Sequence, residues 1–112
     1  MKLTRYCLAL DLIDNPELIS AYEESHKKVW PEVITNIKNA GIEHLELYRV
    51  ENRLMMVMEV NDTFSFDRKA EMDESNEQVQ EWERLMWKYQ QALPNTKPGE
   101  KWRLMKNIFS ME

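Results

Sequence analysis

The sequence has few of the residues that mark several large protein classes. Its single cysteine, Cys7, excludes an internal disulfide and a paired-cysteine metal site, and it favours a reducing, cytoplasmic compartment. Two glycines are too few for a phosphate-cradling loop, and neither the dinucleotide nor the P-loop motif occurs. No apolar run approaches the ~20 residues of a membrane-spanning helix, and the first residues lack a signal-peptide pattern. We therefore expect neither a nucleotide nor a membrane as partner.

The composition is that of one small globular domain, which we expect to span residues 1–112. Apolar residues make up 43% of the 112 positions and charged residues 31%. The net charge of −5 disfavours nucleic-acid binding, which needs clustered lysine and arginine. Four tryptophans and eight methionines are many for this length. Because indole is costly to leave in water, these rings are expected in a core, an interface or a ligand site.

Hydropathy periods in the first half predict a strand and a long helix. Residues 4–12 alternate with period two, which is typical of a strand. Asn15 and Pro16 are a favourable N-cap and first helical residue, and the apolar stripe that follows runs at three- and four-residue spacing to Gly41. Pro31 lies inside this stripe, so we expect a kink or a restart of the helix near it.

The second half completes an α+β pattern. In chain order we expect strands 43–50 and 53–60 joined by a Glu51-Asn52 turn, a short helical segment 64–72, a helix opened by a capping box at Ser75, and a final strand 101–109. In the turn, Asn52 is the residue suited to positive φ. The order βα-ββ-αβ is that of the ferredoxin-like split βαβ fold, an antiparallel sheet with helices on one face.

The predicted sheet is apolar on both faces. In the strand 53–60, Leu54 and Met58 share one face, while Met55 and Val57 lie on the other. A sheet with two apolar faces is not half-solvated, and the simplest cover in so short a chain is a second copy. We therefore expect a homodimer through the face opposite the helices, as in a dimeric α+β barrel.

The two histidines are the candidates for acid–base chemistry. His26 lies one helical turn after Tyr22 and one turn before Trp30, so these side chains are expected on one face. A hydrogen-bonded core histidine and a general acid or base in an apolar pocket both fit this spacing. His44 begins a strand, where a surface or interface position suits it better. Two distant histidines give no metal-ligand spacing, so we expect no metal and no cofactor.

Trp87 does not fit the core stripe of its helix. Trp82 and Met86 lie on that stripe, whereas Trp87 is turned by about 100° from Met86 onto a polar face. An indole in that position calls for a ligand, a partner chain or a covering loop. A tryptophan flanked by polar side chains suits a sugar, because the C–H face of the sugar packs on the indole.

Three motifs together resemble the L-rhamnose mutarotase family, small dimeric ferredoxin-like proteins that interconvert the anomers of 6-deoxy sugars. The motifs are Tyr22-x3-His26-x3-Trp30-Pro31-Glu32, then Gly41 with Tyr48, and Trp87-Lys88-Tyr89 followed by Pro94. The resemblance runs from the first strand to Phe109. The combination of the first and last motifs is more specific than either alone.

The resemblance implies a role for each matching residue. His26 would be the proton donor, Tyr22 would orient the sugar and Trp87 would form a pocket wall. Leu45 stands where the rhamnose enzymes have a substrate-contacting tyrosine, and Met86 where they have a tryptophan. This departure favours L-fucose, which differs from L-rhamnose at C2 and C4. The expected substrate-binding residues are Tyr22, Trp30, Leu45, Tyr48, Met86 and Trp87.

Two other functions fit the same fold. One is a cofactor-free oxygenase or haem-handling protein, and the other is a non-enzymatic small-ligand-binding dimer. Mutarotation opens the sugar ring and closes it on the other face, which needs a proton donor and a proton acceptor and no cofactor. The motifs favour this isomerase, acting on a monosaccharide.

Overall fold

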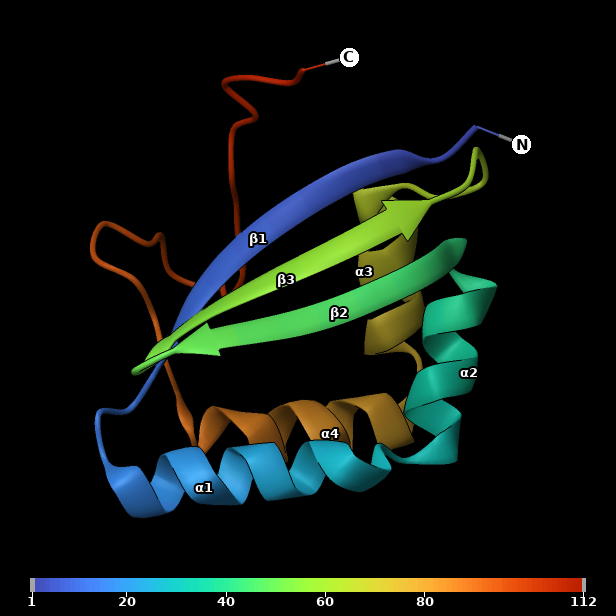
Figure 1. Cartoon of the computed structure of the whole chain (residues 1–112). Coiled ribbons are helices and arrows are strands. Elements are labelled where there is room, and N and C mark those ends of the chain that lie inside the picture. The colour runs from blue at the N-terminus through green and yellow to red at the C-terminus, as the bar shows by residue number, and fades with distance from the viewer. Residues whose placement is uncertain (1, 112) are drawn as a thin grey trace.

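The computed structural model describes residues 2–111 and shows a curved antiparallel sheet with its helices on one face (Figure 1). The elements are β1 Thr4–Leu12, α1 Pro16–Ser25, the 3-10 turn η1 His26–Lys28, α2 Pro31–Asn39, β2 Ile42–Val50, β3 Arg53–Val60, α3 Phe66–Glu74, α4 Glu77–Trp87, β4 Gln90–Gln91 and β5 Arg103–Leu104. The strand order is β2-β3-β1-β4, and β5 also pairs with β1. This order confirms the predicted α+β, ferredoxin-like split βαβ fold.

The long helix expected in the first half is two helices, separated by a 3-10 turn and the extended residues Val29 and Trp30. Asn15 caps α1 as predicted, since its side chain accepts hydrogen bonds from the backbone of Glu17 and Leu18. The chain then makes the short turn η1, and α2 restarts at Pro31. Proline has no N–H and clashes with the carbonyl four residues back, which places the break here. In Figure 1, α2 turns away from the axis of α1. Between residues 2 and 111, no helix is long and apolar enough to cross a bilayer.

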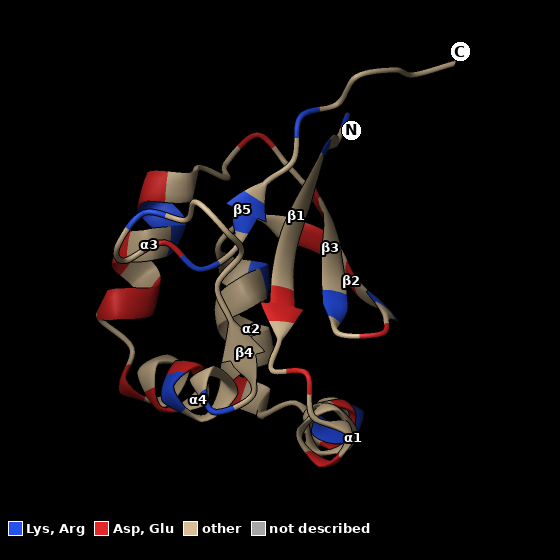
Figure 2. Ribbon diagram, turned by 90° about the vertical axis from the view of Figure 1, so that its left-hand side faces the viewer, with Lys and Arg blue, Asp and Glu red and all other residues tan. Residues whose placement is uncertain are grey.

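The core fills the space between the helices and the inner face of the sheet (Figure 2). Strand alternation supplies the sheet side of this core: Leu10 of β1 pairs with Leu54 of β3, and both are almost fully buried. Tyr22 of α1 and Trp82 of α4 supply the helix side. Burying each such side chain stabilises the fold by roughly 1.5–3 kcal/mol.

Gly41 makes the turn from α2 into β2, as the sequence predicts for the end of the helix. Its φ is +96°, a conformation that glycine adopts without strain. A Cβ at this position would lie 2.7 Å from side-chain atoms of Asn61 and Thr63. Glycine is therefore required both by the backbone angle and by the close approach.

The structure corrects two predicted local details. The N-cap of α4 is Asn76, whose side-chain oxygen accepts hydrogen bonds from the backbone of Gln78 and Val79. Ser75 instead ends α3. In the β2–β3 turn Glu51, and not Asn52, has the positive φ, because the Asn52 carboxamide is turned back to donate to the carbonyl of Leu12.

The predicted final strand is also much shorter than expected. Only Arg103 and Leu104 pair with β1, opposite Ala9 and Leu8. The sequence pattern missed β4, which pairs with the last two residues of β1 and so occupies part of the same edge. Met105 donates one further hydrogen bond to Cys7 of β1, and residues 106–111 are exposed and belong to no helix or strand.

Candidate active site

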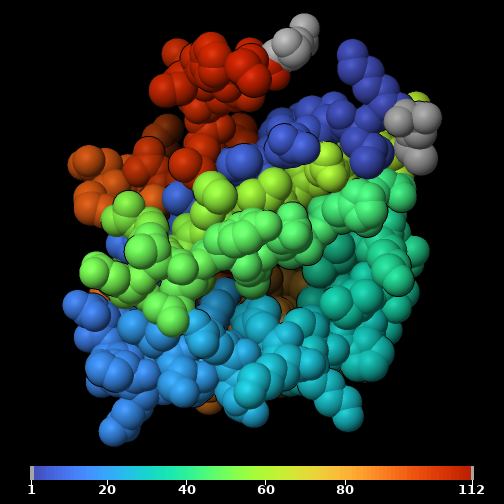
Figure 3. All heavy atoms as spheres, in the orientation of Figure 1, coloured from blue at the N-terminus to red at the C-terminus, as the bar shows by residue number. Residues whose placement is uncertain are grey.

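A cleft of about 410 Å³ opens between α1 and β2, and it is visible as a hollow between these elements in Figure 3. It is lined by Tyr22, Glu23, His26, Lys27, Leu47, Tyr48, Arg49 and Leu54. Tyr22, Leu47 and Leu54 come from the core side, whereas Tyr48 and the charged members lie at the rim. Arg49 of β2 forms an ion pair with Glu23 of α1 and so joins the two walls of the cleft.

His26 is half-buried in the cleft at the end of α1. Its Nδ1 lies 2.8 Å from the carbonyl oxygen of Tyr22 and 3.1 Å from the hydroxyl of Ser25. A carbonyl oxygen can only accept, so Nδ1 carries a hydrogen and Nε2 is the acceptor of the neutral ring. The helix ends at this residue, and the His26 backbone N–H bonds to Glu23 and Glu24 instead. The Tyr22 carbonyl thereby accepts from two side chains, the imidazole Nδ1–H and the Ser25 hydroxyl at 2.6 Å.

The environment of His26 keeps the ring neutral at physiological pH. Burial lowers the pKa of His26 below its ordinary value of 6.5, and the hydrogen bond to the Tyr22 carbonyl opposes this shift only in part. A neutral imidazole with a fixed Nδ1–H presents one basic atom, Nε2. His26 can therefore take a proton first and give it back afterwards.

Tyr22 packs against His26, with the two ring centroids 4.4 Å apart. Its hydroxyl accepts a hydrogen bond from the side chain of Gln90 at 3.4 Å. Burial raises the pKa of Tyr22 to about 12; the Gln90 hydrogen bond opposes this and the charge of Glu83 adds to it. Tyr22 is therefore a neutral hydrogen-bonding group at physiological pH and cannot serve as the base.

Trp82 of α4 stands where Trp30 was expected. It meets His26 edge to face at 5.5 Å between ring centroids, and it meets Trp30 in the same way at 5.2 Å. The three residues Tyr22, His26 and Trp30 do not share one helical face, because the chain leaves the helix between residues 26 and 30. Trp30 nevertheless packs against the same core cluster as Tyr22. Trp82 was correctly predicted to be a core residue, and it is only 7% exposed. Its second contact, with the imidazole, was not expected.

Comparison with known proteins shows which family the chain belongs to. The family model described as L-rhamnose mutarotase matches residues 5–111. The chain belongs to the L-rhamnose mutarotase family. It is also 43% identical to an L-fucose mutarotase from Xanthomonas campestris pv. campestris, over 99% of this chain and 90% of the relative. These matches confirm that the protein is an isomerase of the sugar mutarotase type, and they do not favour the oxygenase and binding-protein alternatives.

Two solved structures show the same fold as this mutarotase. An L-rhamnose mutarotase from Formosa agariphila matches with a TM-score of 0.70 and 23% identity, over 97% of this chain and 99% of that one. A dimeric ferredoxin-like protein from an uncultured marine organism matches with a TM-score of 0.55 and 14% identity, over 100% of this chain and 95% of that one. The predicted family and fold are both confirmed.

Trp87 lies outside the cleft that holds His26. The indole is 43% exposed, and the ammonium of Lys101 sits 5.1 Å from the ring centroid. Lys101 is itself largely buried and forms an ion pair with Glu83. The cation of Lys101 lies over one face of the ring, and the indole remains 43% exposed. Contact with a ligand or a partner chain at this face stays a prediction.

Leu45 and Tyr48 lie on opposite faces of β2. Leu45 is opposite Met58 on the inner face. It lies two residues before the cleft residue Leu47, which is on the same face. Tyr48 borders the cleft but is opposite Met55 on the outer face, where it is 52% exposed. Glu46 lies two residues earlier on the same face, and its negative charge raises the pKa of Tyr48.

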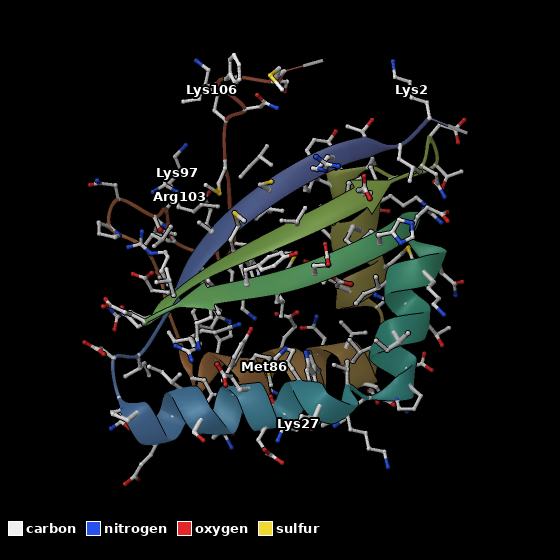
Figure 4. All side chains as sticks on the ribbon, in the orientation of Figure 1. Lys2, Lys27, Met86, Lys97, Arg103 and Lys106 are labelled. Atoms are coloured by element: carbon white, nitrogen blue, oxygen red, sulfur yellow. The ribbon has the colours of Figure 1, made fainter. Side chains whose placement is uncertain are left out.

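Met86 belongs to the core of the mutarotase. It extends from α4 toward the sheet (Figure 4), is 2% exposed and joins the same buried cluster as Tyr22 and Trp82. The tryptophan that the resemblance implied for this position would therefore belong to the packing behind the site. It would not belong to the wall of the cleft itself.

The sequence reasoning missed the charged rim and one apolar wall of the cleft. Glu23 directly follows the predicted site residue Tyr22, and Lys27 directly follows His26. Both therefore lie near the C-terminal end of α1, as the predicted residues do. Leu47 and Arg49 follow Leu45 at the two-residue spacing that keeps a strand residue on one face. That spacing was the available signal, and it separates these residues from Tyr48.

Proposed function

We propose that this mutarotase interconverts the α and β anomers of a 6-deoxy-L-hexose, L-fucose or L-rhamnose, and that His26 carries the proton. The observation that carries the proposal is the neutral imidazole in the cleft, fixed by its Nδ1 contact with Tyr22. The 43% identical relative named L-fucose mutarotase supports the substrate class.

One imidazole suffices for the ring opening because both reacting oxygens are bonded to C1. Nε2 of His26 takes the proton of the C1 hydroxyl, which leaves an oxyanion on C1. As the C1–O5 bond breaks, the C1=O double bond forms and the imidazolium gives that proton to the ring oxygen. Rotation about C1–C2 presents the other face of the aldehyde, and the reverse transfers close the ring. His26 is thus the acceptor in the first half of each step and the donor in the second.

The lining of the cleft matches the two kinds of surface on a deoxy sugar. Leu47, Leu54 and the Tyr22 ring offer apolar surface to the ring C–H groups and the C6 methyl group. Glu23, Lys27 and Arg49 offer charged donors and acceptors to the hydroxyl groups. A few placed polar groups around an apolar pocket are usual for small-molecule sites.

The direct test of the function is anomer exchange. Saturation-transfer NMR on L-fucose and L-rhamnose, with and without the protein, measures the exchange between the anomers. The proposal expects faster exchange for at least one of the two sugars. Spontaneous rates for both sugars at micromolar protein would contradict it.

The pH dependence of the rate follows from the lowered pKa of His26. Because the neutral ring is the active starting form, kcat/KM is expected to be constant near neutral pH. It should fall only as the pH drops through the His26 pKa, which lies below 6.5. Exchange rates corrected for the spontaneous reaction, from about pH 5 to about pH 8, check this. A rate that rises toward acidic pH would show that imidazolium is the starting form.

Leu45 is expected to set part of the sugar preference. Leu45→Tyr adds a phenol on the inner face of β2, beside the cleft, and should shift the kcat/KM ratio of the two sugars toward L-rhamnose by about 3- to 10-fold. The matched control is Leu45→Phe, which adds the ring without the hydroxyl and should leave the ratio near that of the native chain. An equal shift in both variants would assign the effect to ring size alone.

We infer that the mutarotase forms a homodimer through the outer face of the sheet. Ala9, Met55 and Val57 form an apolar surface there that the described helices do not cover. Sedimentation at low micromolar concentration should show a dimer, and Val57→Lys should shift it toward monomer because it places a charge in the apolar interface. A native chain that sediments as a monomer would contradict the inference.

A further inference from the structure

Gln90 is a buried polar side chain, and packing in the core gives no reason for a glutamine at this position. It lies on β4 opposite Leu12 of β1 and is 5% exposed. Its Nε2 donates to the Tyr22 hydroxyl, whereas no described residue between 2 and 111 donates to its buried Oε1. A buried acceptor without a partner destabilises a fold. A methionine of similar length would avoid that cost, so the glutamine calls for a functional reason.

The Gln90 carboxamide determines how the Tyr22 hydroxyl can bond to anything else. A phenol has one hydrogen to donate and can also accept. When Nε2 of Gln90 donates to it, the phenol hydrogen must point away from Gln90. Tyr22 also lines the cleft beside His26, so that hydrogen is the one through which it would donate to an oxygen of a substrate bound there. When the carboxamide turns over, Oε1 becomes an acceptor for the phenol hydrogen, and Tyr22 then presents an acceptor instead.

We propose that Gln90 is a positioning residue that sets whether the Tyr22 hydroxyl meets the sugar as a donor or as an acceptor. The inference rests on the proposed function. During mutarotation the sugar oxygens at C1 and C5 change between hydroxyl groups, which donate and accept, and carbonyl or ring oxygens, which only accept. A phenol that can reverse its hydrogen bond remains paired in both the closed and the open form of the sugar. The unpartnered Oε1 is the acceptor that this reversal uses.

The test is a double-mutant cycle between Gln90 and Tyr22, with L-fucose as the probe. Gln90→Met keeps the length of the side chain and removes its hydrogen bonds. Because the Tyr22 hydroxyl binds both forms of the sugar, the expected result is a KM raised about 5- to 10-fold with kcat nearly unchanged. In the Tyr22→Phe background the same substitution should change KM by less than about 2-fold, since no hydroxyl remains to be positioned. The Tm of Gln90→Met is expected to equal or exceed that of the native chain.

An unchanged KM in Gln90→Met, or an equal rise in KM in both backgrounds, overturns the inference in favour of a structural role. Gln90→Asn is the second variant, because it keeps the buried carboxamide and withdraws it from Tyr22. It should raise KM in the same way, and a native KM in this variant also overturns the inference. If Tyr22→Phe alone leaves KM unchanged, the inference fails while the proposed function stands. If the native chain does not accelerate L-fucose or L-rhamnose exchange, the proposed function itself fails.

Discussion

His26→Ala is expected to lower the protein-catalysed anomer exchange by about 10²- to 10⁴-fold, the usual contribution of a positioned acid–base group. The reason is geometric, because Nδ1 of His26 is occupied by the Tyr22 carbonyl and Nε2 is the atom left for proton transfer. The measurement is kcat/KM for L-fucose and L-rhamnose by saturation-transfer NMR, together with circular dichroism to show that the variant is folded.

His44→Ala is the matched control for the loss of an imidazole. His44 is exposed near the start of β2, opposite Glu59 and away from the cleft. It is expected to keep at least about half of the native rate, since surface substitutions of this kind rarely change a distant site. Equal losses of kcat/KM in the two folded variants would show that His26 does not carry the proton.

Trp82→Ala is expected to lower the free energy of unfolding by about 3–5 kcal/mol, the usual range for deleting a buried indole. Trp82 is 7% exposed, and it supports His26 and Trp30 with edge-to-face contacts. The loss therefore opens a cavity directly beside the imidazole. Urea unfolding measures the effect, and kcat/KM should fall as well, because the ring that positions His26 is removed.

Trp87→Ala provides the comparison, since the same atoms are deleted five residues further along α4, on a different face of the helix. Trp87 is 43% exposed and contacts Lys101, so the expected cost is about 1 kcal/mol or less. If both variants lose the same stability, Trp82 is not the central aromatic of this site. A loss of catalysis in Trp87→Ala equal to that in His26→Ala would indicate that Trp87 contacts the substrate.

Most of the fold could be predicted from local sequence patterns. Period-two alternation predicted the strands β1 and β3 and the residues of each that face the core, and Pro31 marked the break between the first two helices. The errors lie where tertiary contacts decide between similar local choices. Asn76 and Ser75 are both good caps; the Ser75 hydroxyl bonds to the last turn of α3, and Asn76 caps α4. Two-residue strands such as β4 carry no period at all, so no pattern could reveal Gln90.

The candidate site was predictable only where it is local. Tyr22 and His26 are four residues apart on one helical turn, and the structure brings their rings together. Trp82 and Gln90 reach the same place from α4 and β4, more than fifty residues away in the chain, and only the three-dimensional packing shows this. The extended link after His26 likewise moved Trp30 off the face that its spacing had indicated.

The central claim, that His26 acts at Nε2 as a neutral imidazole, is tested most directly by its nitrogen NMR signals. In a ¹⁵N-histidine-labelled sample, titrated with and without L-fucose, the account predicts a hydrogen on Nδ1, an unprotonated Nε2 at neutral pH and a pKa below 6.5. His26→Ala identifies the signals by their loss. A hydrogen on Nε2 at neutral pH, or a pKa at or above 6.5, would contradict the account.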